Sequence, residues 1–207
     1  MKKNFVFLLL AGMLLTGCSQ NTQANLGANS STENVAPEAT QNEEKEETEK
    51  EGTEETEEDT VVLSFEASTI DGEPMTSQIF AQSKLTMMNV WATYCNPCLS
   101  EMPDLGEIAA SYDTSDFQII GIISDVAEGA GEEELANARD LVLQTGADYP
   151  HLLLNESLYT NLVGAVDSVP TTFFVNNEGE VLGYTIGAKS KADWEEIIHE
   201  LLEQNES

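Results

Sequence analysis

The sequence predicts an α/β domain built on a mixed β-sheet with helices on both faces. Two observations carry this prediction. Short apolar segments alternate with amphipathic ones between residues 61 and 204, and the last two strand candidates are joined by a tight turn. Alternating strands and helices are typical of sheets sandwiched by helices, and a hairpin adds an antiparallel edge. The 148 residues from 60 to 207 suit one domain with its own core.

The first half of this region contains three strand candidates and one helix. Residues 61–65 are a short strand candidate, and Asp71-Gly72 is a turn. A buried strand is expected at 85–91 and a helix over about 97–111. Residues 117–124 form a central strand, because their run of isoleucines is continuous, as expected where both faces of a strand are covered.

The second half continues the alternation of strands and helices. A helix over 132–145 begins with three glutamates, which the positive end of a helix dipole favours. A final helix over 191–204 has apolar residues at helical spacing. Between these two helices we expect a strand at 151–154, a short helix at 156–163, and strands at 171–175 and 180–186 around the turn Asn176-Asn177-Glu178-Gly179.

The first residues are typical of a secretion signal. Lys2 and Lys3 precede an apolar run over 5–15, which is too short to span a bilayer core of about 30 Å as a helix. The run ends in Leu15-Thr16-Gly17-Cys18, which resembles the lipobox of bacterial lipoproteins. That resemblance implies a signal peptide at 1–17 and lipidation of Cys18 with acyl chains such as palmitate. The alternative is a stray cysteine beside an ordinary signal peptidase site.

The segment that follows has no apolar periodicity. Residues 19–41 are mostly small and polar, and residues 43–59 are mostly glutamate. Such a composition cannot offset the entropy of ordering, so we expect 18–59 to be a solvated tether from a lipidated Cys18. Fully extended, it would reach at most about 140 Å at ~3.5 Å per residue. The alternative is an acidic arm that binds calcium or a partner.

The charge of the remaining domain restricts its partners. Residues 60–207 carry 25 Asp and Glu against 4 Lys and Arg, a net charge of −21. Nucleic acid requires cations to pair with its phosphates, so this surface excludes nucleic-acid binding and also disfavours docking on acidic lipid. Arg139, the only arginine, is expected to pair with a carboxylate, and His151 and His199 are expected to be structural or surface residues.

The most informative motif is the pair Cys95 and Cys98, the only cysteines besides Cys18. The pair follows an apolar strand and opens a helix, so Cys95 is expected at the helix N-cap, with Pro97 in the first turn. Free backbone N–H groups and the helix dipole stabilise a thiolate there and lower the thiol pKa. The pattern predicts a redox pair. A structural disulfide or half a metal site are the alternatives, and zinc would lack its other ligands.

The stretch from Trp91 to Pro103 resembles the active-site signature of the thioredoxin superfamily, and in particular of the membrane-tethered TlpA and ResA type of thiol-disulfide oxidoreductase. Residues 148–154 are similar to the close of the central insertion of that family. Residues 169–175, with Glu178-Gly179, are similar to its cis-proline strand and hairpin. The resemblance covers about 61–204 and implies a thioredoxin-like fold with a TlpA-type central insertion.

The resemblance also implies roles for single residues. Cys95 is the attacking thiol, Cys98 is the resolving thiol, and the two form the redox-active disulfide. Pro170, which residue statistics alone would place in a trans peptide bond, is cis and opposes the pair. The backbone of Val169 pairs with a substrate peptide. The remaining expected substrate-groove residues are Asn96, Pro97 and Trp91, and for Trp91 the alternative is a place in the core.

Three positions distinguish this sequence within the superfamily. Asn89 stands where cytoplasmic thioredoxins keep a buried aspartate, and it cannot take a proton. Glu101 occupies the place of a glutamate found in ResA-type proteins, and we expect it to be the general base that deprotonates Cys98. The alternative is a solvated helix glutamate. Tyr94 stands where tryptophan is usual before the first cysteine.

The expected function is therefore thiol-disulfide exchange outside the cytoplasm, on the outer side of the cell membrane. A monomeric, lipid-anchored reductase would take electrons from a membrane thiol donor of the CcdA or DsbD type. It would pass them to disulfides in exported proteins such as apocytochrome c or a methionine sulfoxide reductase, and it would need no cofactor or metal. The alternatives are a thiol oxidase that forms disulfides in secreted proteins and a substrate-binding lipoprotein.

Overall fold

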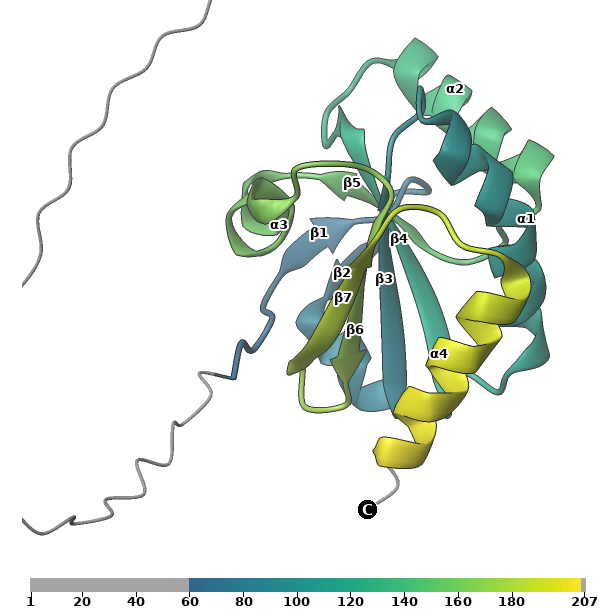
Figure 1. Cartoon of the computed structure of the whole chain (residues 1–207). Helices are drawn as coiled ribbons and strands as arrows, with labels where there is room; N and C mark the ends of the chain where they lie inside the picture. The colour runs from purple at the N-terminus through teal and green to yellow at the C-terminus, as the bar shows by residue number, and fades with distance from the viewer. Residues whose placement is uncertain (1–59, 206–207) are drawn as a thin grey trace, which may run out of the picture. The chain divides into compact units, whose positions relative to one another are not determined.

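A five-stranded mixed sheet forms the centre of the domain, with strand order β5-β4-β3-β6-β7 (Figure 1). The computed structural model describes residues 60–205. The expected signal peptide at 1–17, the lipidation of Cys18 and the tether at 18–59 lie outside the described residues and stay predictions. Within 60–205, no helix combines the length and the apolar content that crossing a membrane requires.

The central strand β3 (Leu85–Trp91) sets the topology. It pairs parallel with β4 (Phe117–Ala127) and antiparallel with β6 (Thr171–Asn176). At the two edges, β5 (His151–Leu154) runs parallel to β4, and β7 (Val181–Ile186) runs antiparallel to β6. The predicted mixed sheet with an antiparallel hairpin edge is therefore confirmed.

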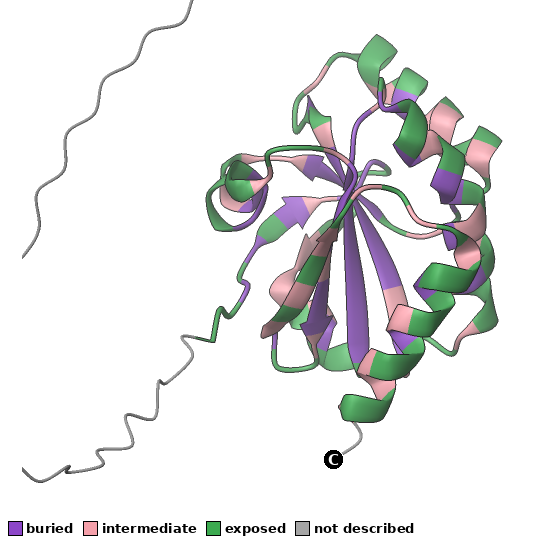
Figure 2. Ribbon diagram, viewed as in Figure 1, coloured by how far each residue is buried: buried purple, intermediate pink, exposed green. Residues whose placement is uncertain are grey.

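Side chains of alternate residues in β3 point to opposite faces of the sheet, and both faces are covered. Met88 and Val90 pack in one apolar cluster, and Met87 and Trp91 pack in clusters on the other face. Every residue of β3 is buried, which explains why this strand lacks polar alternation (Figure 2). Three helices cover the Met87 face: α1 (Asn96–Ser111), α2 (Glu132–Thr145) and α4 (Lys191–Gln204). The other face packs against α3 (Glu156–Asn161) and the 3-10 helices η1 (Ser77–Gln82) and η2 (Val163–Ala165).

The strand predicted at 61–65 is wrong. The first strand is β1 (Glu66–Ser68), which pairs antiparallel with β2 (Pro74–Thr76) around the predicted turn at Asp71-Gly72. Residues 61–63 instead follow the edge of β7, where Val62 forms an isolated bridge to Glu180. The apolar side chains of residues 61–65 are compatible with a regular strand and with the single bridge to Glu180. Which of the two forms depends on a neighbour that is distant in the sequence.

Two boundaries also differ from the prediction. β4 continues to Ala127, three residues beyond the predicted end at Ser124, because Ala127 still pairs with Leu154 of β5. The short helix predicted at 156–163 ends at Asn161, since Leu162 leaves the helical conformation (φ −146°, ψ −63°), and a 3-10 turn follows.

Candidate active site

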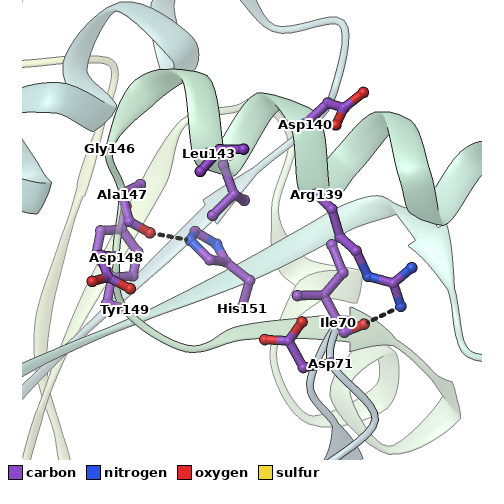
Figure 3. A pocket seen from close by; sticks show the side chains of 11 residues that line it. Ile70, Asp71, Arg139, Asp140, Leu143, Gly146, Ala147, Asp148, Tyr149 and His151 are labelled. Carbon is purple, nitrogen blue, oxygen red and sulfur yellow. Dashed lines mark hydrogen bonds between the residues drawn. The ribbon is translucent and has the colours of Figure 1, made fainter.

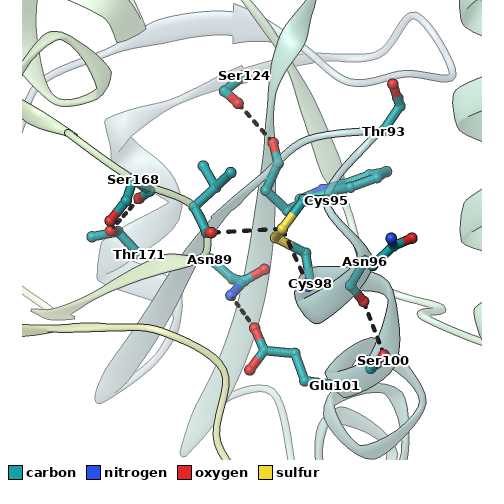
Figure 4. The surroundings of a disulfide bond; sticks show 12 residues. Asn89, Thr93, Cys95, Asn96, Cys98, Ser100, Glu101, Ser124, Ser168 and Thr171 are labelled. Carbon is teal, nitrogen blue, oxygen red and sulfur yellow. Dashed lines mark hydrogen bonds between the residues drawn. A yellow bond between two sulfur atoms is a disulfide. The ribbon is translucent and has the colours of Figure 1, made fainter. Parts of the chain in front are cut away.

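Cys95 lies at the N-cap of α1, at the carboxyl end of the central strand β3. Its backbone is extended (φ −85°, ψ 94°), and its Sγ accepts a hydrogen bond from the backbone N–H of Cys98 at 3.3 Å. Pro97 occupies the first turn, where its missing N–H costs no hydrogen bond. Cys95 and Cys98 are joined by a disulfide (Figure 4). The predicted N-cap position of Cys95 is therefore confirmed.

The two cysteines differ in their access to solvent. Cys95 is 6% exposed, whereas Cys98 is 0% exposed beneath it. An incoming sulfur can therefore approach Cys95 from solvent, but it cannot approach Cys98. Asn96 and Pro97 are exposed beside the pair, and Tyr94 is 73% exposed just before it. These three side chains are available for contact with a partner.

The loop before β6 faces the cysteine pair. The Val169–Pro170 peptide bond is cis, in the position that the resemblance implied. The carbonyl oxygen of Val169 lies 3.6 Å from the Sγ of Cys95. In the disulfide this sulfur has no proton, so the contact becomes a hydrogen bond only when Cys95 is a thiol. Val169 thus brings a backbone carbonyl and a half-buried side chain to the edge of the redox pair.

Two residues at the end of β4 hold the loop that carries Cys95. The backbone N–H of Thr93 donates to both carboxylate oxygens of Asp125, at 3.0 and 3.1 Å, and the Thr93 hydroxyl donates to the same carboxylate. Ser124 Oγ donates to the backbone oxygen of Trp91 at 2.9 Å. Sequence reasoning missed both residues. The signal was a polar Ser-Asp pair at the end of an otherwise apolar strand.

Glu101 is buried, so the alternative of a solvated helix glutamate is wrong. Its carboxylate accepts hydrogen bonds from the side chain of Asn89 at 3.2 Å and from the indole N–H of Trp194 at 3.3 Å. The backbone N–H of Lys189 donates to it at 3.1 Å. Burial raises the pKa of the Glu101 carboxyl above its usual range, although these hydrogen bonds oppose the shift. The Glu101 carboxylate is therefore a stronger base than the carboxylate of an ordinary glutamate.

Asn89 connects Glu101 to the strand that follows the cis-proline. Its Nδ2 donates to Glu101 and also to Thr172 Oγ1 at 3.0 Å. Its Oδ1 is buried and accepts no hydrogen bond from the protein. The polar side chains beneath the cysteine pair thus come from β3, α1 and β6. This network could not be read from the sequence, because its members are spread over more than 80 positions.

Trp91 requires a correction. Its side chain is fully buried, so it cannot contact a substrate in this conformation, contrary to the expectation that it lines the groove. Its indole N–H donates to His151 Nδ1 at 3.1 Å, and His151 Nε2 lies 3.1 Å from the carbonyl oxygen of Ala147. The two contacts together require the neutral ring with its proton on Nε2. Burial lowers the pKa of His151 to about 4, so the predicted structural role of this histidine is supported.

A pocket of about 560 Å³ lies over His151, between α2 and the turn after β1 (Figure 3). Arg139 crosses one side of it, donating to the carbonyl oxygen of Ile70 at 2.8 Å and pairing with Glu132 at 3.4 Å. The predicted carboxylate partner of Arg139 is thus confirmed. No cysteine lines this pocket, so it is separate from the redox pair.

Comparison with known sequences agrees with this geometry. Residues 59–183 match the AhpC/TSA family. The thiol-disulfide oxidoreductase ResA of Bacillus thuringiensis (strain Al Hakam) is 27% identical over 120 residues, which are 58% of this chain and 65% of that protein. ResA of Halalkalibacterium halodurans is 26% identical over 141 residues, 68% of this chain and 73% of that protein. The chain therefore spans just under two thirds of the length of the Bacillus relative.

Solved structures confirm the thioredoxin-like fold. A thiol:disulfide interchange protein of the thioredoxin family from Chlorobium tepidum TLS is similar with a TM-score of 0.57 and 30% identity, covering 69% of this chain and 96% of that one. The pneumococcal exposed lipoprotein thioredoxin of Streptococcus pneumoniae strain TIGR4 is similar with a TM-score of 0.51 and 26% identity, covering 67% of this chain and 99% of that one.

Proposed function

Since the chain belongs to the AhpC/TSA family and is a TlpA/ResA-type member of the thioredoxin superfamily, we propose that it catalyses thiol-disulfide exchange through Cys95 and Cys98. One observation carries the proposal. The redox pair opens α1 with only its first sulfur accessible, and that sulfur receives an N–H hydrogen bond from the helix start. These features favour a nucleophile at Cys95 and an internal resolving thiol at Cys98.

The exchange proceeds in two steps. The Cys95 thiolate attacks one sulfur of a substrate disulfide, forms a mixed disulfide and displaces the other substrate sulfur as a thiolate. The Cys98 thiolate then attacks Cys95 Sγ, which closes the Cys95–Cys98 disulfide and releases the second substrate thiolate. Both released thiolates take up protons. The substrate gains two electrons and two protons, and the protein loses the same, so no cofactor is needed.

Glu101 is proposed as the general base for the second step. Cys98 is fully buried, so its thiol loses a proton less readily than a solvated one. Glu101 follows one helical turn later, and burial raises its pKa above its usual range. A carboxylate with a raised pKa is better suited to accept a thiol proton near neutral pH. Substrate contact is proposed for Asn96 and Pro97, which are exposed beside Cys95, and for the backbone of Val169.

The direction and place of the exchange are also proposals. We infer a reductase, anchored outside the cytoplasm through a lipid on Cys18 and held off the membrane by residues 19–59. The lipobox-like sequence supports the anchor, and the pneumococcal relative is itself named an exposed lipoprotein. A membrane thiol donor of the CcdA or DsbD type would reduce Cys95–Cys98. Disulfides of exported proteins, such as apocytochrome c or a methionine sulfoxide reductase, would reoxidise the pair.

Trapping the mixed disulfide tests the reaction. Replacing Cys98 with serine should let Cys95 form a mixed disulfide with a model protein disulfide that cannot resolve, visible as a band shift on a non-reducing gel. Cys95→Ser should form none, because the buried Cys98 cannot be reached. Equal trapping by both variants would contradict the assigned roles. Peroxide consumption by the reduced chain, without disulfide exchange, would point instead to peroxidase activity.

A further inference from the structure

A groove lies on the sheet face opposite α1, between the edge strand β7 and the segment formed by α3 and η2. Its volume is about 610 Å³. Leu162 and Ala165 line it from the helical side, and Thr60 and Val61, at the start of the described chain, also line it. We call this hollow the β7 groove. Its strand wall consists of Phe173, Val181, Leu182, Gly183 and Tyr184.

Exposed apolar side chains concentrate around this groove. Tyr184 is 65% exposed and Ile186 is 60% exposed, both on β7. Eight large apolar side chains are exposed among residues 60–205, and six of them lie on β7, on the chain that pairs with it or on α3. Three of the six, Val61, Leu182 and Tyr184, line the groove itself, and such a concentration of exposed apolar side chains favours a binding surface.

The paired strands β6 and β7 link the groove to the loop that faces the redox pair. Ile186 pairs with Thr171, the residue after the cis-proline, and Gly187 donates its N–H to the carbonyl oxygen of Pro170. Val169 packs against both the apolar cluster that underlies the groove and the cluster that contains Cys95. Phe173 lies three residues beyond Pro170, roughly 10 Å along the strand at ~3.3 Å per residue.

We propose that the β7 groove binds an extended apolar segment of the polypeptide whose disulfide Cys95 attacks. This inference rests on the proposed function and names its substrate class, polypeptides with aromatic or aliphatic residues within a few positions of the reacting cysteine. During exchange, the substrate is covalently held at Cys95. Any chain that continues from it past Val169 therefore meets the groove at high effective concentration.

The protein's own preceding residues fit the groove poorly. Thr60 lies at its end, and residues 57–59 are Glu, Glu and Asp. Glu180 already lines the groove, so a further carboxylate would meet like charge and would lose hydration against apolar walls. An apolar segment of another polypeptide removes apolar surface from water without that cost.

The test compares two peptide disulfides as substrates of the reduced full chain. Both probes carry a cysteine bridged to glutathione, with either leucine and phenylalanine or two serines at the fourth and fifth positions after it, more than about 10 Å along an extended chain at ~3.3 Å per residue. We expect a KM roughly tenfold lower for the apolar peptide. Leu182→Ser and Tyr184→Ser should abolish that preference, whereas Leu143→Ser, an exposed leucine on α2 outside the groove, should retain it.

Reduction of glutathione disulfide separates the two levels of the proposal. If the unmodified chain does not reduce it, the proposed exchange itself fails. If it does, equal KM values for the two peptides, or equal losses in Leu143→Ser and Leu182→Ser, overturn the groove assignment. If deletion of residues 1–59 lowers the KM for the apolar peptide below its value for the full chain, the assignment is overturned too, because the chain's own segment then occupies the groove. Thermal unfolding of each variant checks folding, and Ile186→Ser replaces any variant that does not fold.

Discussion

At the scale of single residues, Cys95 and Cys98 have different environments although only two residues separate them. Cys95 is 6% exposed and receives an N–H hydrogen bond at its sulfur, whereas Cys98 has no exposed surface. The proposed order of attack and resolution rests on these positions in the first helical turn. The sequence predicted the N-cap position of Cys95 correctly, because a helix start after a buried strand is a local feature.

The proposed role of Glu101 leads to a prediction for mixed-disulfide release. Glu101→Gln keeps an acceptor for Trp194 and Lys189 but removes the proton-accepting carboxylate. We expect release of a mixed disulfide from Cys95 to slow by about tenfold to a hundredfold at pH 7, a part of what a general base contributes. Alkylation of Cys95 by iodoacetamide should stay close to the rate of the unmodified protein.

Glu107→Gln is the matched control, since Glu107 lies on the same helix but is exposed and pairs with Lys191. Its release rate should be unchanged. The general-base role is excluded if Glu101→Gln releases the mixed disulfide as fast as Glu107→Gln does.

The second residue-scale prediction concerns His151 and pH. Its pKa is lowered to about 4 in the folded chain, against about 6.5 when unfolded, so the unfolded chain binds an extra proton between these values. The neutral, buried ring therefore contributes in full to the free energy of unfolding above pH 6.5. This contribution falls by up to about 3 kcal/mol as the pH is lowered toward 4. Urea unfolding of His151→Gln, measured from pH 7 to 4, should show a correspondingly weaker acid dependence. An unaltered pH profile in the variant would contradict this assignment.

At the scale of elements, local patterns determined most boundaries. The limits of β3, α2, β5 and α4 agree with the prediction, because short apolar runs mark the two strands and helical periodicity marks the two helices. The strand at 61–65 failed because its pairing partner, β7, lies more than 100 positions away. Two further features were missed for the same physical reason: the hydrogen bonds between Thr93 and Asp125, and the burial of Glu101. Each depends on which elements the fold brings together.

Helices α1 and α2 approach closely at one glycine, which gives an element-scale prediction. A methyl group on Gly106 of α1 would overlap the carbonyl oxygen of Gly146 at the end of α2. Gly106→Ala should therefore push the helices apart and cost about 1–3 kcal/mol of unfolding free energy, despite the higher helix propensity of alanine. Gly183→Ala, which adds a methyl group to open space, is the control for chemical denaturation. A Gly106→Ala chain as stable as the unmodified protein would contradict this contact.

At the scale of the whole molecule, the proposed function depends on where the domain is held. If Cys18 is lipidated, Cys18→Ser should release the protein from the membrane fraction of expressing cells while exchange activity in solution is retained. Cell fractionation followed by immunoblotting measures this, and Cys98→Ser serves as the control that should stay membrane-bound. Equal membrane association of the Cys18→Ser and Cys98→Ser chains would exclude a lipid anchor at this residue.

The central claim is that the Cys95–Cys98 pair acts as a reductant, and its midpoint potential tests this most directly. The Cys18→Ser chain leaves only these two thiols, so thiol alkylation after equilibration in glutathione or dithiothreitol buffers reports the pair alone. We predict a potential near or below about −250 mV, in the range of reducing thioredoxins. A value near about −120 mV, typical of a strong oxidant, would contradict the account and make this protein a disulfide-forming enzyme.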